Sequence, residues 1–370
     1  MNTIELNRFV VILIYGSLVL LSFLKLTNPL KVNKKANFWF GMFLFLWSTF
    51  WLDEIVSLAM ISSIDVHSVF LIQLIQFLTP VIFFFSVLFY TNPAFKFKTS
   101  DIKYSILPFI FFVILFLQRF ETYESKPGYF DTLAFISISL ILFQAIFYTG
   151  LSYITIRKHQ KRIQQFSANT EGINLNWLEY IILVLFIVSI VYVIYNLFYD
   201  STSLNVFINL IFLLVIYFVG YYSLKQKEIY PLEEKQREEL ISINTDPEAE
   251  ETKRKLISDD ELLRIKTQLE ALMNNEKPYL DSELNLIKLA ERLSVSTHHL
   301  SYIINTGFQK NFFQYVNEYR IEHAKKLLKD NSNNKLSILG IAYESGFNSK
   351  TSFNTTFKKL TDQTPSEFKK

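Results

Sequence analysis

The sequence predicts an all-α protein with two unlike halves: a seven-helix transmembrane bundle, followed by a smaller domain of two helix-turn-helix units. Half of its 370 residues are hydrophobic, and seven long apolar segments fill residues 1–224. Most charged residues lie after residue 224, and one helical pattern occurs twice near the C-terminus. The absence of Cys excludes disulfides, a Cys-based zinc site and a Cys nucleophile.

Each apolar segment is long enough to cross a bilayer, which takes about 20 mostly apolar residues. Seven such runs exceed what a soluble core of this size could bury. The N-terminus carries Glu5 beside Arg8 rather than a basic cluster, which is not typical of a cleaved signal peptide. The segments are Phe9–Leu24, Phe38–Met60, Ser68–Tyr90, Ile102–Leu117, Thr132–Ile156, Trp177–Tyr199 and Leu204–Leu224.

The basic residues of the predicted loops indicate the orientation of the bundle, because Lys and Arg favour the cytoplasmic side. One set of loops holds thirteen of them, whereas the other holds only Arg8, Arg119 and Lys126. We therefore expect the N-terminus outside, the C-terminal half in the cytoplasm, and no outer loop longer than about Gln118–Asp131. The thirteen are Lys25, Lys31, Lys34, Lys35, Lys96, Lys98, Lys103, Arg157, Lys158, Lys161, Arg162, Lys225 and Lys227.

Four polar residues in or beside the spans form a candidate membrane signal site: Asp53, Glu54, Gln73 and Gln76. Ionisable groups at membrane depth are functional candidates. In the alternative interpretation, Asp53 and Glu54 lie at the interface near a span end. We expect the bundle to sense a small or lipophilic ligand, or another membrane protein, since seven spans exceed what an anchor requires.

Residues 225–258 form a predicted cytoplasmic linker that is charged, net acidic and interrupted by Pro231 and Pro247. This composition is typical of a solvated tether, with some helix around Leu232–Ile241. The C-terminal domain is expected over residues 259–370, with helix-turn-helix units at about 284–306 and 336–360.

A helix is predicted over Asp260–Met273, with Ser258 or Asp259 as its N-cap. Its apolar residues recur at three-four-three spacing, although two heptads are too few for a coiled coil. The helix therefore either packs on the first unit or pairs two chains in a homodimer. The recurring residues are Leu262, Ile265, Leu269 and Leu272.

The second unit, Ile338–Phe368, has the pattern of a helix, a tight turn and another helix. Gly346 stands where a chain leaving a helix often needs positive φ, and Phe347 fills the angle between the helices. Ser349 is the expected N-cap of the second helix. The apolar residues that follow helical spacing are Ile338, Ile341, Ala342, Phe353 and Phe357.

The polar face of this second helix is rich in hydrogen-bond donors and free of carboxylates. That composition suits a helix laid in a DNA major groove, where some groups meet phosphates and others meet base edges. Its residues are Lys350, Thr351, Ser352, Thr355 and Lys358.

The same pattern occurs about fifty residues earlier. Leu286-x-x-Leu289-Ala290 corresponds to Ile338-x-x-Ile341-Ala342, and Leu300 corresponds to Phe353. The first unit thus has helices expected around Leu286–Leu293 and Ser296–Asn305. A long helix over Phe312–Leu328, capped by Asn311, joins the two units, so the domain is an internal repeat.

Residues from about 260 to 370 resemble the C-terminal DNA-binding domain of AraC-type transcription regulators, a family of bacterial proteins. The second unit carries the resemblance at many positions. Asp362 departs from it, since the family usually has Gly there, but Asp tolerates a left-handed conformation. The matching residues are Ile341, Ala342, Gly346, Phe347, Ser349, Phe353, Phe357, Lys358, Lys359, Thr364, Pro365 and Phe368.

The resemblance implies two recognition helices that enter successive major grooves of double-stranded DNA. By matching positions, it implies base contacts from His298, Ser301 and Tyr302 in the first helix. In the second helix it implies base contacts from Lys350, Thr351, Ser352 and Thr355. The predicted DNA-binding set also includes the flanking residues Ser296, Thr297, Asn348, Ser349, Lys358 and Lys359.

The sequence therefore predicts a regulator in a bacterial inner membrane rather than an enzyme, because it lacks a phosphate-binding Gly loop and other catalytic motifs. We expect no cofactor. His298 and His299 could suggest a metal site, but neighbouring helical residues point about 100° apart and no further ligand follows. A receptor whose helical tail binds a protein partner instead of DNA remains the second hypothesis.

Overall fold

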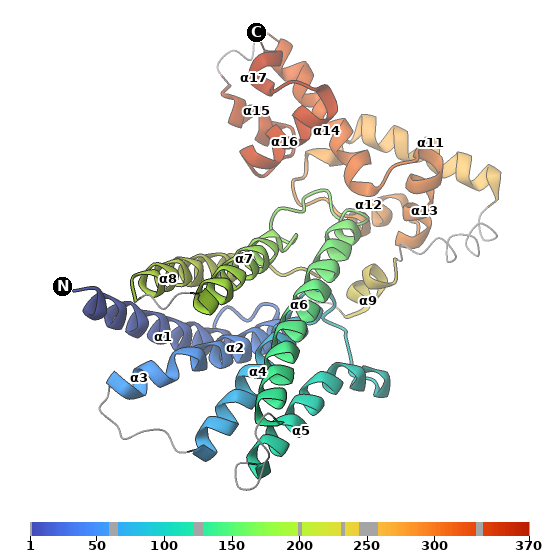
Figure 1. Cartoon of the computed structure of the whole chain (residues 1–370). Helices are drawn as coiled ribbons and strands as arrows, with labels where there is room; N and C mark the ends of the chain where they lie inside the picture. Colours follow the sequence, from blue (N-terminus) through green and yellow to red (C-terminus); the bar gives the residue numbers. More distant parts are fainter. Residues whose placement is uncertain are drawn as a thin grey trace. The chain divides into compact units, whose positions relative to one another are not determined.

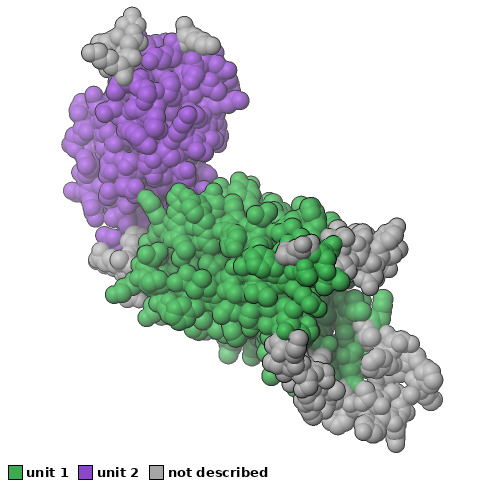
Figure 2. All heavy atoms as spheres, turned by 90° about the vertical axis from the view of Figure 1, so that its left-hand side faces the viewer, with its two compact units in different colours: residues 1–157, 175–229 green, residues 158–174, 230–370 purple. Residues whose placement is uncertain are grey.

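The computed structural model describes residues 2–58, 66–121, 129–198, 202–230, 234–243, 258–330 and 336–369. In this described part all named elements are helices, with one isolated β-bridge between Ser167 and Asn285 (Figure 1). The chain forms two compact units (Figure 2). Unit 1 comprises residues 1–157 and 175–229, and unit 2 comprises residues 158–174 and 230–370.

Unit 1 contains a helix at each of the seven predicted apolar segments. Six stretches of its described residues are long and apolar enough to cross a membrane. Helix α7 covers another predicted segment, but several of its side chains lie outside the described residues, as do residues 122–128 of the longest predicted outer loop. The helices are α1 (Thr3–Thr27), α2 (Lys34–Ser48), η1 (Thr49–Trp51), α3 (Leu52–Leu58), α4 (Val66–Thr91), η2 (Thr99–Ser105), α5 (Ile106–Glu121), α6 (Tyr129–Ile163), α7 (Asn176–Phe198) and α8 (Thr202–Lys225).

Large apolar side chains are found on the outside of this unit as well as in its core. Phe135 is 71% exposed, Leu214 69% and Phe109 67%. A helix that is hydrophobic on all sides belongs either in the core of a large protein or in a membrane. Because these side chains lie outside the core, the exposed surface suits a lipid environment.

A buried cluster of polar side chains links four helices of unit 1. The Asn37 side chain accepts hydrogen bonds from the Tyr90 hydroxyl (2.6 Å) and Lys25 Nζ (3.4 Å). Lys25 Nζ also donates to the carbonyl of Ser223 at 2.6 Å. The cluster therefore connects α1, α2, α4 and α8, and the polar groups buried there are paired.

In unit 2, the structure places a helix at each predicted position of the two helix-turn-helix units. Helices α12 and α13 form the first, α15 and α16 the second, and α14 joins them (Figure 1). The bounds are α9 (Glu234–Ser242), α11 (Asp259–Asn275), η3 (Pro278–Leu280), α12 (Leu286–Leu293), α13 (Thr297–Phe308), α14 (Phe312–Lys329), α15 (Ile338–Glu344), α16 (Lys350–Thr361) and α17 (Pro365–Phe368).

Side-chain caps begin the helices of the two units. The residue before each helix accepts a hydrogen bond from a backbone N–H of the first turn, which would otherwise lack a partner. Ser349 does so for α16 and Asn311 for α14, as predicted from the sequence. The other caps are Asn285, Ser296, Ser337 and Thr364.

Helix α11 packs on the first helix-turn-helix unit, which is one of the two interpretations left open by its sequence. Ile265 and Leu269 are buried, and Lys266 Nζ donates to the carbonyl of Gly307 in α13 at 2.9 Å. Ile265 and Leu269, two of the four regularly spaced apolar residues of this helix, are therefore buried within the chain.

Helix α14 supplies side chains to the cores of both helix-turn-helix units. Phe312 and Val316 are buried near its beginning, and the ring of Tyr315 lies 4.6 Å from that of Phe308 in α13. Farther along, the buried residues of α14 join those of α15 and α16 in one cluster. That cluster contains Ile321, Ala324, Leu328, Ile341, Ala342, Phe347, Phe353 and Phe357.

The turn between α15 and α16 depends on Gly346. This residue has φ +84°, as expected from the sequence, and a Cβ built on it would lie 2.3 Å from the carbonyl oxygen of Tyr279. Only Gly adopts this conformation without strain and allows the backbone of another segment to approach so closely. The turn thus places the second helix-turn-helix unit against the segment that precedes the first helix-turn-helix unit.

We predict that Gly346→Ala destabilises unit 2 by at least about 2 kcal/mol. Ala would have to adopt the left-handed conformation of this residue, and its Cβ would clash with the backbone of Tyr279. Gly307→Ala is the control, since its Cβ would meet Lys266 Cδ at 3.6 Å, an ordinary contact. Hydrogen exchange of residues 258–369 measures the effect. Trp fluorescence would not report on unit 2, because all four Trp residues lie in unit 1. Equal protection in both variants would contradict the prediction.

Candidate nucleic-acid interface

Helix α16 presents most of its predicted DNA-contacting side chains to solvent. Phe353 and Phe357 are fully buried and hold the opposite face on the core, where the ring of Phe347 lies 5.2 Å from that of Phe353. Asp362 ends the helix with φ +59°, so it takes the left-handed conformation usually given to Gly. The exposed predicted residues are Lys350, Thr351, Thr355, Lys358 and Lys359, whereas Asn348, Ser349 and Ser352 are half-buried.

Helix α13 exposes less of its predicted DNA-binding face than α16 does. Thr297 is 3% exposed and Ser301 8%, although both belong to the predicted DNA-binding set. His298 and Tyr302 are half-buried, and the N-cap Ser296 is exposed. The two helices that match in sequence therefore differ in how much of their polar face is open.

Helix α9 covers part of α13. Composition predicts a solvated tether here, yet Leu240 is 1% exposed and Ile243 is 4% exposed. Glu239, between them, accepts a hydrogen bond from the hydroxyl of Thr297. The α9 part of the predicted linker thus packs on the domain rather than extending into solvent, and residues 231–233 and 244–257 lie outside the described part.

The segment 158–174, between α6 and α7, belongs to the same compact unit as the helix-turn-helix helices. The carbonyl of Phe166 accepts a hydrogen bond from Leu286 N, and that of Gln164 accepts from Phe313 N, both at 2.9 Å. These donors are first-turn N–H groups of α12 and α14, which have no partner within their own helices. In the sequence this segment is marked only by its basic residues, and no local pattern indicates its role in the fold.

Arg320 in α14 is a deeply buried charged residue, with 1% of its surface exposed. Its Nε donates to the carbonyl of Tyr279 (2.8 Å) and its Nη2 to that of Asp281 (2.9 Å). Its Nη1 lies 3.4 Å from the carbonyl of Ala168. The guanidinium also lies over the ring of Phe347, 5.6 Å from its centroid. No periodicity in the sequence distinguishes it from a surface Arg.

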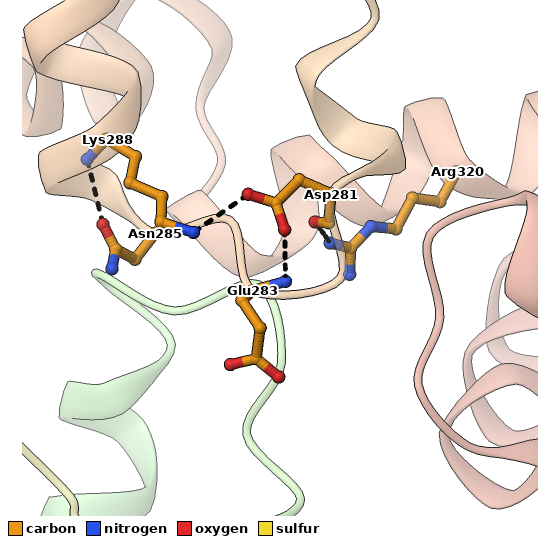
Figure 3. A network of polar contacts seen from close by, with 5 residues as sticks. All are labelled: Asp281, Glu283, Asn285, Lys288 and Arg320. Carbon is orange, nitrogen blue, oxygen red and sulfur yellow. Dashed lines mark hydrogen bonds and ion pairs between the residues drawn. The ribbon is translucent and has the colours of Figure 1, made fainter.

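An acidic pair supports this arginine from the segment between α11 and α12. Figure 3 shows the Asp281 carboxylate bonded to Lys288 Nζ and to the backbone N–H of Glu283, both at 2.9 Å. Burial alone would raise the pKa of Asp281, but these bonds and the charges of Lys288 and Arg320 bring it below its usual range. Burial lowers the pKa of Arg320 to about 10 against the opposing effect of Asp281 and Glu283, so it stays charged at neutral pH.

The candidate membrane residues are not joined to one another by any hydrogen bond in the described part of the chain. Glu54 accepts from Asn7 Nδ2 at 3.4 Å, and Asn7 Oδ1 accepts from Asn209 Nδ2 at 2.9 Å. Gln76 Nε2 donates to the carbonyl of Thr49 at 3.1 Å. Asp53, Glu54 and Gln73 are all exposed. Of the four candidate residues, Glu54 thus connects α3 to α1 through Asn7, and Asn7 in turn connects α1 to α8.

We predict that Arg320→Met destabilises the domain by about 2–4 kcal/mol, because several buried carbonyl oxygens lose their donor. The matched control is Arg292→Met, which removes an exposed ion pair with Glu276 (3.3 Å) and costs at most about 1 kcal/mol. Hydrogen exchange across α12–α16 measures both. An equal effect of the two substitutions would show that Arg320 does not organise the domain.

Comparison with known proteins agrees with this geometry. Residues 289–370 match the family model described as a helix-turn-helix domain. The chain is 35% identical over 100 residues (27% of its length) to an uncharacterized HTH-type transcriptional regulator in the cgkA 5′ region of Pseudoalteromonas carrageenovora, of which it covers 57%. Over 100 residues, again 27% of its length, it is 30% identical to the HTH-type transcriptional regulator GlxA of Rhizobium meliloti, of which it covers 30%.

A third relative, an uncharacterized HTH-type transcriptional regulator of Staphylococcus aureus, is 35% identical over 91 residues, which make up 25% of this chain and 12% of that protein. The chain thus spans less than two thirds of each of these relatives. No solved structure matches. The C-terminal part of the chain is a helix-turn-helix domain of the AraC type, shared with HTH-type transcription regulators.

Proposed function

We propose that the chain is a membrane-tethered, sequence-specific DNA-binding transcription regulator of the AraC type, which responds to a signal through its bundle. The observation that carries the proposal is that one chain holds an AraC-type domain and, within its described residues, six helices apolar enough to span a membrane.

The polar face of α16 supports DNA as the ligand. Helices α13 and α16 contain no Asp or Glu, and α16 carries Lys350, Lys358 and Lys359. Recognition helices place their N-terminal residues at base edges, while Lys side chains meet phosphates. The exposed Thr351 and Thr355 are therefore suited to base contacts, and Lys358 and Lys359 to the backbone.

The distribution of basic residues supports tethering at the cytoplasmic side. Thirteen Lys and Arg residues lie in the loops and helix ends assigned to the cytoplasm and three in the others, which favours an odd number of spans with the C-terminus inside. A DNA-binding domain requires this orientation in a bacterial inner membrane.

For signal sensing, we propose that the bundle holds the site near Asp53, Glu54, Gln73 and Gln76. The hydrogen bonds from Asn7 to Glu54 and from Asn209 to Asn7 link three helices, so a small or lipophilic ligand or a membrane protein that displaces them would move these helices together. The signal then changes the spacing, pairing or order of the DNA-binding domains, including any homodimer.

We predict that random-site selection with the full chain in nanodiscs yields a motif with two parts about one helical turn apart. The double variant Thr351→Ala/Ser352→Ala should weaken binding at one part by roughly 5- to 100-fold, since a specific base contact is worth about 1–3 kcal/mol. Lys359→Ala is the contrasting variant: it should weaken all sequences alike and lower the salt slope by about one. Binding indifferent to sequence and to Thr351→Ala/Ser352→Ala would favour a tail that docks a protein partner.

We also predict the orientation of the chain. Because it has no Cys, single substitutions Thr3→Cys and Lys96→Cys report on opposite sides of the membrane. An impermeant maleimide should label Thr3→Cys in intact cells and Lys96→Cys only after lysis. The reverse labelling pattern would refute the proposed topology.

A further inference from the structure

The N-terminal ends of the two recognition helices share a feature that lies outside their own sequences. Each receives a carboxylate from a segment that precedes the AraC-type domain. The hydroxyl of Thr297, the first residue of α13, donates to Glu239 of α9. The hydroxyl of Ser349, the N-cap of α16, donates to Glu171 in the segment 158–174.

We infer that Glu239 and Glu171 form a built-in inhibitory contact, in which two carboxylates occupy the ends of the recognition helices that DNA must approach. This inference rests on the proposed function. A helix N-terminus attracts anions through its free N–H groups and its dipole. A carboxylate seated there takes the place of a phosphate and repels the approaching DNA backbone.

The segment that carries Glu171 is held in place by specific bonds. The carbonyls of Gln164 and Phe166 accept from first-turn N–H groups of α14 and α12. The carbonyl of Ala168 accepts from Asn317 Nδ2 at 3.1 Å, and Ala168 N donates to the carbonyl of Leu284 at 3.4 Å. Glu171 is therefore placed by several backbone contacts.

Apolar anchors fix both inhibitory segments. Ile163 is fully buried and Phe166 is 3% exposed, and the ring of Phe166 lies 5.7 Å from that of Tyr230. Leu240 and Ile243 anchor α9 in the same way around Glu239. Burial of these large apolar side chains stabilises the docking of both segments.

The two recognition helices are masked to different degrees. Thr297 and Ser301 are buried, whereas Lys350, Thr351 and Thr355 of α16 are exposed. DNA can thus meet part of the second helix while the first stays covered. Full binding at two major grooves requires α9 and the segment 158–174 to move.

The position of this segment in the chain provides a route for the signal. Helix α6 runs without interruption to Ile163, and α7 begins at Asn176. A shift between these two helices pulls directly on the residues that bond α12, α14 and Ser349. Release of Glu171 would open the N-terminus of α16, and a larger shift of the segment would also break its bonds to α12 and α14.

The test uses the full chain in nanodiscs and the DNA motif selected by that chain. We expect Glu171→Gln and Glu239→Gln each to raise affinity about fivefold or more, and the double variant to raise it further. Each change keeps the shape of the side chain and removes its charge. If the carboxylates were merely stabilising helix caps, their loss would lower affinity or leave it unchanged.

Matched controls separate this effect from a general change of net charge. Glu238→Gln lies on the same helix as Glu239 and is exposed, and Glu344→Gln is exposed on α15. Both should leave affinity within about twofold. Equal gains in the controls and the test variants would overturn the inference.

Disulfide trapping gives a readout independent of charge, because the chain has no Cys of its own. Ser349→Cys removes the cap of α16, so the double variant Glu171→Cys/Ser349→Cys is compared only with itself: oxidation should lower the DNA affinity that the reduced form shows. Specific DNA should also slow the oxidation, since it displaces the segment. Equal binding by both redox forms would overturn the inference.

The two proposals fail in distinguishable ways. Specific binding that is equal in the wild-type chain and in Glu171→Gln/Glu239→Gln would refute the inhibitory contact and leave the regulator intact. No specific binding by either protein would refute the regulator. Binding by the double variant alone would support both proposals.

Discussion

The buried guanidinium of Arg320 is the interaction on which unit 2 depends. Its donors reach the carbonyls of Tyr279 and Asp281, in the turn before the first helix-turn-helix unit, and its plane meets the ring of Phe347 in the second. A further donor points to Ala168, in the segment between α6 and α7. A planar guanidinium with five donors in fixed directions serves several acceptors at once, which a Lys could not do.

The arrangement around Arg320 explains why Gly346 and α14 matter together. The absent Cβ of Gly346 lets the carbonyl of Tyr279 approach, and that carbonyl is the one bound by Arg320 Nε. Helix α14 carries the arginine at its middle and contributes to a core on either side. The spacing of α13 and α16 is therefore set by one helix, α14, and by one buried charge.

Charge is divided between segments in a way that suits regulation. The recognition helices contain no carboxylate, which favours DNA, while Glu171 and Glu239 come from separate segments, which the proposed inhibitory contact requires to undock. An acidic residue inside a recognition helix would oppose DNA in every state. Placed on a separate segment, it opposes DNA only while that segment is docked, so the same domain has two affinities.

The sequence by itself determined the helices of this protein and the type of its C-terminal domain. Apolar runs long enough to cross a bilayer, and caps such as Asn311 and Ser349, are local signals, and local signals specify where helices begin and end. Gly346 and Asp362 were likewise predictable, because a left-handed turn restricts residue type at one position. Tertiary structure alone decided the partners of Arg320, the burial of Thr297 and Ser301, and the docking of residues 158–174. Those contacts join residues that are about forty to 180 positions apart, and no periodicity encodes which distant carbonyl or carboxylate will meet a given donor.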